Sequence, residues 1–270
     1  MSNTLSEWTT FAIGGNARAV NIALSRGMLI DGAGTLVLGR GSNVLVSDHG
    51  YDGIVTVNRC DEIRRNGSTV TVGSGARLSA LCGYLAENGL SGLEWACGIP
   101  GSVGGAVKMN AGAFGGEISD SLVEVELLRG GQVLVLPKTE LGFGYRVSGI
   151  TGDDIVVSAT FALERDDGNA IKSRMRAYNA LRRNAQPSGR SAGSIFKNPK
   201  GVSVGRVFDE CGLKGLRRGG AEISQVHANV IVNVGGATAK DVTALIGIMR
   251  TELVSRGIPA QEEIIYIGEF

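Results

Sequence analysis

Glycine is the residue that most restricts how this chain can fold. The sequence has 42 glycines and only 5 prolines among 270 residues, about twice the usual share of glycine. The glycines gather in short clusters without a fixed period, which excludes a collagen helix and argues against a flexible linker. We therefore expect them in loops where the main chain closely approaches another segment or a ligand.

Charge and length indicate the broad class of protein. The 27 basic and 26 acidic residues leave a formal net charge of +1, so the chain lacks the basic excess typical of nucleic-acid-binding proteins. No apolar run reaches the ~18 residues that a membrane-spanning helix needs, and the polar start MSNTLSEWTT does not resemble a secretory signal. Four irregularly spaced cysteines favour reduced thiols over a disulfide or zinc framework. We expect a globular cytoplasmic protein that binds neither nucleic acid nor membrane.

The first part of the chain is predicted to consist mainly of short strands. Aliphatic and β-branched runs bounded by Gly, Asp or Asn predict strands at 19–24, 35–38, 43–46, 53–57, 70–72, 122–128, 132–136 and 154–163. The pair Gly130-Gly131 predicts a tight turn between two of them. One helix is expected at 76–88, with an apolar stripe at helical spacing and Gly89 at its end.

The last third is predicted to mix longer helices with strands. Helices are expected at 171–185, 204–211 and 238–256, and strands at 230–234 and 264–267. The long helix has Thr238 as its N-cap, Asp241 in its first turn and Gly257 as its stop. With its flanking strands it forms a small α+β unit. The polar run 164–169 places a domain boundary near residue 165.

Two glycine-rich segments are candidates for ligand binding. They are Gly39–Asn43 and Gly98–Ala106, and neither matches G-x-G-x-x-G or G-x-x-x-x-G-K-[ST], which disfavours a Rossmann site and a P-loop. Such loops present successive main-chain N–H groups to a phosphate, but they also serve as tight turns between packed strands. The segment Lys108–Gly116 is equally ambiguous, because its small residues suit either a flat ring system or a neighbouring strand.

Ser194, in the stretch SAGSIFKNP, raises a question of chemistry. A serine nucleophile normally needs an imidazole base, and the chain has only His49 and His227. The stretch also fails the G-x-S-x-G pattern of the nucleophile elbow. Ser194 is therefore either a turn residue or the agent of some other reaction.

Few other residues are candidates for catalysis. Arg146 could equally form a surface ion pair, the acidic pair Glu262-Glu263 could be solvated, and His227 could be a satisfied strand histidine. No His, Cys or carboxylate residues stand at the spacing of metal ligands, so we expect no metal.

Taken together, the motifs resemble the UDP-N-acetylenolpyruvoylglucosamine reductase family. These flavoenzymes complete UDP-N-acetylmuramate for bacterial peptidoglycan. The resemblance runs from Thr10 to Gly268 and depends on the order and spacing of several short motifs. These are Thr10–Gly15, Gly39–Asn43, Gly98–Gly105, Tyr145–Ser148, Ser191–Pro199 and Gly212–Gly215.

The resemblance implies an α/β (α+β) fold and a dissociable FAD. The fold would comprise a two-lobed FAD-binding domain of the vanillyl-alcohol-oxidase-like type, with lobes at 1–60 and 61–165, and a C-terminal α+β substrate-binding domain at 166–270. The family does not attach FAD covalently through a histidine, so His49 has no such role. The FAD-binding residues implied are Gly39, Arg40, Gly41, Ser42, Asn43, Gly98, Ile99, Pro100, Gly101, Ser102, Gly104, Gly105, Asn110, Ala111, Gly112, Ala113 and Arg182.

The implied reaction is the reduction of UDP-N-acetylglucosamine enolpyruvate by NADPH through FAD. A fixed cation beside the substrate carboxylate would stabilise the charge that develops there, and Arg146 matches the family's arginine. Glu263 matches its glutamate, which would polarise that carboxylate through a shared proton. Ser194 matches its proton donor. A hydroxyl is a weak acid that protonates only a strongly basic carbanion or enolate, which explains the lack of a histidine partner. The implied substrate contacts are Tyr145, Lys197, Asn198, Lys214 and His227, with Lys214 suited to a diphosphate.

The sequence departs from the family pattern in two places. The family commonly reads L-E-P-E near its end, whereas this chain has Ala260-Gln261-Glu262-Glu263, so Glu262 is the alternative to Glu263 if the register shifts. The chain also lacks the long insertion that carries a tyrosine over the nucleotide, which groups it with the compact form of the family and leaves open what closes over UDP.

Two rival functions and several properties remain open at this stage. The rivals are another FAD oxidoreductase of this fold that acts on an alcohol or hydroxy acid, and a catalytically silent nucleotide-binding module. Intact Arg146, Ser194 and Glu263 argue against both. We expect a monomer or weak oligomer whose product serves cell-wall biogenesis, and through it cell shape, cell division and the cell cycle. The preference for NADPH over NADH does not follow from the sequence.

Overall fold

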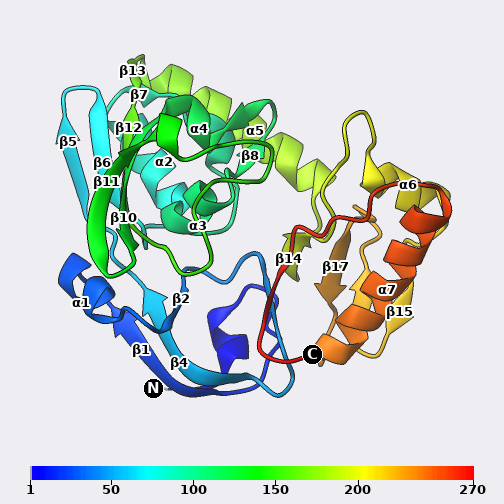
Figure 1. Ribbon diagram of the computed structural model, residues 1–270. Coiled ribbons are helices and arrows are strands. Elements are labelled where there is room, and N and C mark those ends of the chain that lie inside the picture. Colours follow the sequence, from blue (N-terminus) through cyan, green and yellow to red (C-terminus); the bar gives the residue numbers. More distant parts are fainter. Residues whose placement is uncertain (1) are drawn as a thin grey trace. The chain divides into compact units, whose positions relative to one another are not determined.

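The computed structural model describes residues 2–270, which fold into two compact units (Figure 1). The first unit comprises Met1–Val20, Gly41–Ile54 and Arg183–Phe270, and the second comprises Asn21–Arg40 and Val55–Arg182. Three elements continue from one unit into the other: β1 (Ala17–Ala23), β4 (Tyr51–Asn58) and α5 (Gly168–Ala185). Each unit is thus assembled from segments that are distant in sequence.

A five-stranded antiparallel sheet forms the framework of the second unit. Its order is β11-β10-β12-β6-β5. The strands are β5 (Ile63–Asn66), β6 (Thr69–Gly73), β10 (Leu122–Arg129), β11 (Gln132–Pro137) and β12 (Ile155–Ala162). Gly130 and Gly131 have φ values of +57° and +78° and join β10 to β11, as a type I′ hairpin turn requires. The predicted turn is therefore confirmed.

Helices cover the sheet because its strands carry apolar side chains toward them. The main core of the unit combines sheet residues such as Val72, Val125 and Phe161 with Leu81 of α2 (Leu78–Glu87) and Val107 of α3 (Val103–Lys108). A smaller cluster contains residues of β12 and Leu29 of α1 (Arg26–Asp31). Strand β2 (Leu36–Leu38) pairs in parallel with the part of β4 that begins at Val55.

Short elements complete the second unit. They are β7 (Leu90–Ser91), a 3-10 helix (Glu94–Ala96), β8 (Gly112–Ala113), β9 (Gly116–Glu117), α4 (Ile118–Ser121), a second 3-10 helix (Lys138–Glu140) and β13 (Glu164–Arg165).

The first unit contains a four-stranded antiparallel sheet of order β14-β17-β16-β15. Its strands are β14 (Arg190–Ser194), β15 (Arg217–Arg218), β16 (Ala221–Ile223) and β17 (Val230–Asn233), accompanied by α6 (Val204–Glu210) and α7 (Ala239–Ser255). A 3-10 helix (Leu5–Trp8) lies near the N-terminus, and β3 (Val44–Val46) pairs in parallel with β18 (Ile265–Ile267). In Figure 1 the last residues of the chain, drawn in red, end beside the blue N-terminal segments of this unit.

Many elements have the type predicted from the sequence, and one of the two glycine-rich segments departs from its prediction. The predicted types are confirmed for α2, α6, α7, β10, β12 and β17. The prediction that Gly98–Ala106 is a loop is wrong over its second half, because α3 begins at Val103, with the Ser102 hydroxyl accepting the Gly105 N–H. Three glycines or alanines inside a six-residue helix give no periodic signal. Helix α5 begins at Gly168, before the predicted Ile171, because the Asp167 carboxylate accepts main-chain N–H groups there.

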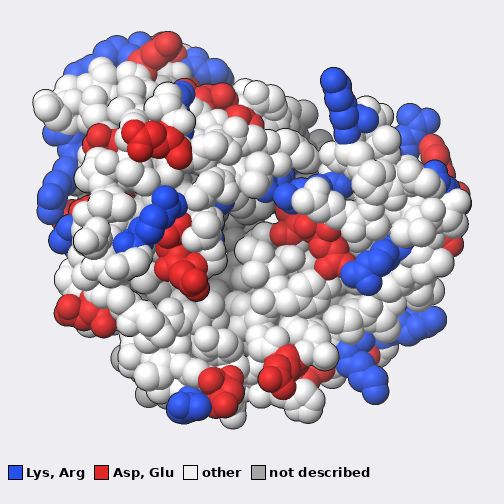
Figure 2. Space-filling view, in the orientation of Figure 1, with Lys and Arg blue, Asp and Glu red and all other residues white. Residues whose placement is uncertain are grey.

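Charged side chains of both signs are interspersed on the face shown in Figure 2, in keeping with a net charge of +1. Among residues 2–270, no helix is both long and apolar enough to cross a bilayer.

Candidate active site

Within the second unit, Gly39 at the start of the first glycine-rich segment meets the second segment. A Cβ placed on Gly39 would lie 2.2 Å from the Ser102 Oγ, so any larger residue would collide with it. Likewise, a Cβ on Gly104 would lie 2.8 Å from the Cβ of Ser74, and the Gly104 N–H donates to the Ser74 carbonyl (2.8 Å). These glycines therefore allow close approach of main chains. The structure brings together two segments that lie far apart in sequence.

Three arginines gather around this contact. The Arg59 Nη1 donates to the Gly39 carbonyl (2.7 Å) and the Arg40 Nη2 to the Gly75 carbonyl (3.3 Å). Burial, followed by the charges of Arg40 and Arg77, lowers the pKa of Arg59 to about 10. Burial and then Arg77 also lower the pKa of Arg40, and Asp61 offsets this in part. The arrangement concentrates like charge and suits an anionic ligand.

One hydrogen-bond donor of Arg40 is left without a partner among the described residues. Its Nε is buried and lacks a hydrogen-bond partner within the part of the chain that the structure describes. A buried, unsatisfied donor is costly and uncommon in proteins. The cradle formed by Gly39, Ser102 and the arginines therefore fits a ligand that carries phosphate groups.

The segment Asn110–Ala113 lies beside Arg146. The Arg146 Nη2 donates to the Gly112 carbonyl (2.5 Å), and the guanidinium carbon lies 5.0 Å from the centre of the Tyr145 ring. Arg146 has a φ of +54°, a conformation that is uncommon for a non-glycine residue and that often marks functional positions. Asn110 is fully buried, and its amide binds the Gly144 carbonyl and the Ser119 N–H, so its side chain supports this segment from within.

Arg182 lies against the second glycine-rich segment. A Cβ on Gly98 would be 2.9 Å from the Arg182 Cδ. Burial lowers the pKa of Arg182. Helix α5 thus presents one more cation to the segment that the sequence analysis had assigned to cofactor binding.

In the first unit, Ser194 and Glu263 lie on neighbouring segments. The Glu263 N–H donates to the Ile195 carbonyl and the Lys197 N–H to the Gln261 carbonyl, both at 2.8 Å. The Asn43 amide donates to the Glu263 carbonyl (2.9 Å). The segment that carries Ser194 is therefore joined to Glu263 by main-chain hydrogen bonds, and the side chain of Asn43 is joined to the Glu263 carbonyl.

Glu262 and Glu263 have different surroundings. Glu262 forms an ion pair with Arg250, and it contributes with burial to a raised pKa of the Tyr266 hydroxyl. The Glu263 N–H instead donates to the carbonyl of Ile195, the residue after Ser194.

The predicted substrate contacts also belong to the first unit, except Tyr145. The Asn198 Oδ1 accepts the N–H of Val204, where α6 begins (3.0 Å). The Lys214 ammonium pairs with Asp209 (2.7 Å). His227 accepts the Asn229 N–H at its Nδ1 (3.2 Å), so its Nε2 carries the proton when the imidazole is neutral.

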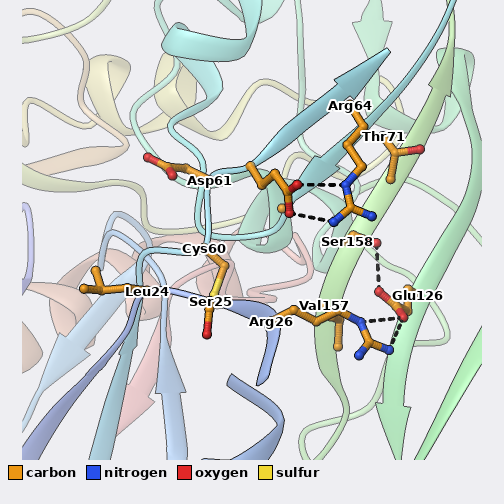
Figure 3. Close-up of a pocket in the computed structure, with 12 residues that line it drawn as sticks. Leu24, Ser25, Arg26, Cys60, Asp61, Arg64, Thr71, Glu126, Val157 and Ser158 are labelled. Carbon is orange, nitrogen blue, oxygen red and sulfur yellow. Dashed lines mark hydrogen bonds and ion pairs between the residues drawn. The ribbon is translucent and has the colours of Figure 1, made fainter. Parts of the chain in front are cut away.

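A surface pocket of about 300 Å³ lies elsewhere in the second unit (Figure 3). Its lining residues come from α1, β5, β6, β10 and β12 and from the segments next to α1 and β5, and the Arg26 guanidinium points toward Glu126 (Figure 3). Arg26 is paired with Glu126, and Arg64 with Glu62. None of the predicted site residues lines this pocket.

Two residues that the sequence analysis did not single out hold parts of the site. Arg59 binds the first glycine-rich segment, and Asn229 binds the main chain beside Ser194. Arg59 could have been suspected as a cation after a strand, but Asn229 gives no signal in the sequence, because its partners are more than 30 residues away.

Comparison with known proteins shows the family. A curated relative from Rubrobacter xylanophilus, named UDP-N-acetylenolpyruvoylglucosamine reductase, is 40% identical over 98% of this chain and 94% of its own length. The relative of the same name from Lactobacillus johnsonii is 48% identical over 86% of this chain and 80% of its own. This chain belongs to the UDP-N-acetylenolpyruvoylglucosamine reductase family.

Family models and a crystal structure agree with this membership. Residues 185–267 match the C-terminal domain of UDP-N-acetylenolpyruvoylglucosamine reductase, and residues 18–136 match an FAD binding domain. The crystal structure of the reductase from Thermus caldophilus superimposes with a TM-score of 0.87, at 40% identity and 97% coverage of both chains. The resemblance seen in the sequence motifs and the expected fold class are confirmed.

FAD fits the cradle in the second unit. The glycine-rich segments and the arginine cluster (Arg40, Arg59 and Arg77) all lie within or beside residues 18–136. The pyrophosphate of FAD carries negative charge that would offset the positive charge of this cluster. Its oxygens could also accept a hydrogen bond from the unsatisfied Arg40 Nε.

Proposed function

We propose that this chain reduces UDP-N-acetylglucosamine enolpyruvate to UDP-N-acetylmuramate, with FAD as cofactor and NADPH as reductant. The observation that supports the proposal is the main-chain hydrogen bond from Glu263 to Ile195, which joins the segment of Ser194, the proposed proton donor, to the proposed glutamate in a member of this reductase family. The product is a precursor of peptidoglycan. The chain is thus an FAD-dependent oxidoreductase.

The substrate double bond must gain a hydride at its terminal carbon and a proton at the carbon beside the carboxylate. Bound FAD supplies the hydride, which it receives from NADPH. Arg146 stabilises the negative charge that develops next to the carboxylate, because a fixed guanidinium is an effective partner for it. Its contact with the Gly112 carbonyl holds the guanidinium in place.

Ser194 delivers the proton, and Glu263 shares a proton with the substrate carboxylate. The hydroxyl protonates the substrate carbon only after negative charge has formed there, since the ordinary acidity of a serine is too low for an earlier step. The resulting alkoxide regains a proton from solvent. Hydrogen bonds from the Asn43 amide to the Glu263 carbonyl and from the Glu263 N–H to the Ile195 carbonyl hold the main chains of these two segments together.

The remaining assignments concern binding and cellular role. Arg40, Arg182 and the glycine-rich segments would hold FAD, and Tyr145, Lys197, Asn198, Lys214 and His227 would contact the substrate. The FAD-binding lobes would span 1–60 and 61–165, and the substrate-binding domain 166–270. The protein would act in the cytoplasm as a monomer or weak oligomer and support cell shape and division.

The test uses the holoenzyme in two anaerobic half-reactions. Replacing Ser194 by alanine should leave flavin reduction by NADPH nearly unchanged and slow reoxidation by the enolpyruvyl substrate by about 100-fold or more, the usual contribution of a general acid. Stopped-flow absorbance of the flavin measures both rates. If the wild-type flavin stays reduced in the presence of the substrate, the proposed activity is wrong; if S194A slows both half-reactions equally, Ser194 has a structural role instead.

A further inference from the structure

Asn229 is a buried polar residue whose side chain hydrogen-bonds to the main chain near Ser194. It is 1% exposed and is the last residue of the turn before β17. Its Oδ1 accepts the Phe196 N–H (3.0 Å), and its Nδ2 donates to the Phe196 carbonyl (2.8 Å). Its own carbonyl accepts the Ile195 N–H (2.8 Å). Three hydrogen bonds from one residue therefore fix residues 195 and 196.

The strand that carries Ser194 is irregular just before the serine. Ser191 pairs with Val232 and Ser194 with Val230, so β14 has one residue more than β17 over this interval. Gly193 absorbs the extra residue with a φ of +76°. Such a bulge changes the direction of the following side chain. It also interrupts the inter-strand hydrogen bonds that would otherwise fix the main chain there. The direction of Ser194 consequently depends on how the chain after it is anchored.

That anchor comes from Asn229 on one side and from residues 261–263 on the other. Phe196 is completely buried, so both of its main-chain polar groups must be satisfied inside the protein. The Asn229 amide serves both. The same residue donates its N–H to the Nδ1 of His227 and so connects Ser194 with a proposed substrate contact.

We propose that Asn229 is a positioning residue for Ser194. Its amide holds the peptide after Ser194 at the correct distance from β17, and this aims the hydroxyl at the substrate carbon that it protonates. The proposal rests on the proposed function, because it assumes that Ser194 is the proton donor. Asn229 itself contacts neither substrate nor cofactor.

The experiment is a double-mutant cycle between Asn229 and Ser194 in the holoenzyme. Variants N229A, S194A and the double variant are reduced with NADPH and reoxidised by the enolpyruvyl substrate in anaerobic stopped flow. We expect N229A to slow reoxidation by about tenfold or more, as misplacement of a catalytic group does, and to leave reduction by NADPH within about twofold of the wild type. In the S194A background, N229A should change reoxidation by less than about twofold, because the two residues act as one.

A second variant and a matched control separate positioning from folding. N229D keeps the acceptor for the Phe196 N–H, and its second oxygen can donate to the Phe196 carbonyl only while the carboxyl group is protonated, so its reoxidation rate should lie between those of N229A and the wild type at low pH and fall as the pH rises. N233A removes an asparagine of the same strand whose amide binds the Phe11 and Ala12 carbonyls instead. This control should lower the melting temperature and leave both half-reactions unchanged.

Each result of the cycle has a defined meaning. If N229A slows the S194A enzyme by the same factor as the wild type, or if N229A and N229D both lose the flavin spectrum or the melting transition, Asn229 is structural and the inference is overturned. If S194A itself reoxidises at the wild-type rate, the proposed role of Ser194 fails instead. Substrate dissociation constants of the oxidised variants, measured by flavin absorbance, should stay within about threefold of the wild type.

Discussion

At the scale of single residues, the protein concentrates positive charge beside its glycine-rich segments. Arg59 is half-buried and close enough to Arg40 and Arg77 that burial and their charges lower its pKa to about 10. Such a cluster is unfavourable alone and becomes favourable with an anion. The cluster is therefore a feature of cofactor binding more than of stability.

Replacing Arg59 by glutamine should weaken FAD binding by about tenfold or more, because a charge-assisted hydrogen bond contributes roughly 1.5–3 kcal/mol. The dependence of the dissociation constant on salt should also become smaller. Fluorescence titration of FAD with the apoprotein measures both. The control is R18Q, which removes an exposed arginine paired with the exposed Asp52. Equal FAD affinity in R59Q and the wild type would refute the assignment.

His227 couples stability to pH. Burial is the largest influence and lowers the pKa of its imidazole, and the charge of Lys214 lowers it further, while its main-chain hydrogen bond has the opposite effect. The unfolded chain therefore binds a proton at a higher pH than the folded protein does. The free energy of unfolding should fall as the pH drops through 6.5, the ordinary pKa of histidine, toward the lower folded value.

Replacing His227 by glutamine should reduce this loss of stability between about pH 7.5 and 5.5. Urea unfolding at the two pH values measures the difference for wild type and variant. His49 is exposed, so H49Q serves as the control and should lose as much stability as the wild type. A pH dependence that is the same in H227Q and the wild type would contradict the prediction.

At the scale of elements, the N-terminus of α7 could be predicted from the sequence. The Thr238 Oγ1 accepts the Asp241 N–H (3.1 Å), and the Asp241 carboxylate accepts the Thr238 N–H (3.0 Å). The Asp48 carboxylate accepts the next free N–H groups, those of Ala239 and Lys240. The capping pair is local and appears in the sequence, whereas Asp48 is a distant partner that only the fold supplies.

Replacing Thr238 by alanine should lower the free energy of unfolding by about 1 kcal/mol, the usual effect of losing an N-cap. Chemical denaturation measures the change, and T243A, in the same helix but past its first turn, is the control. A loss in T238A no larger than in T243A would show that Asp48 caps the helix without help from Thr238.

The predictable elements are those with a local cause. The hairpin at Gly130-Gly131, the stripe of α2 and the caps of α7 all depend on neighbours within a few residues. Helix α3 escaped prediction because its burial depends on contacts with β6 and β12, outside its own glycine-rich sequence. The same holds for the site: motifs identified Ser194 and Glu263, but not Asn229.

At the scale of the whole molecule, the first unit is assembled from three separate stretches of chain. Its core includes Phe11, Ile13 and Leu45, together with residues of β14, α6 and α7. Strand β18 has its partner, β3, more than 200 residues earlier in the sequence. The C-terminal residues thus need the N-terminal ones to complete their core.

Residues 183–270 expressed alone should lack a stable fold. They lose Phe11, Ile13 and Leu45 from the core and leave β18 without β3, and a small core that loses several large side chains cannot offset its conformational entropy. Thermal scans by circular dichroism should show no cooperative transition for the fragment and a clear one for the full chain. A sharp transition in the fragment would show that this segment folds independently.

The sequence alone established the family, the fold class and the motifs of the site, because each depends on residue types at short spacing. Through the resemblance to the family it also suggested the role of proton donor that we propose for Ser194. Only the tertiary structure decided which segments meet: Gly39 with the Ser102 side chain, the Glu263 main chain with that of Ile195, and the Asn229 side chain with the Phe196 main chain. These contacts join segments tens to hundreds of residues apart, and their energy depends on burial and hydrogen-bond geometry that no local pattern encodes.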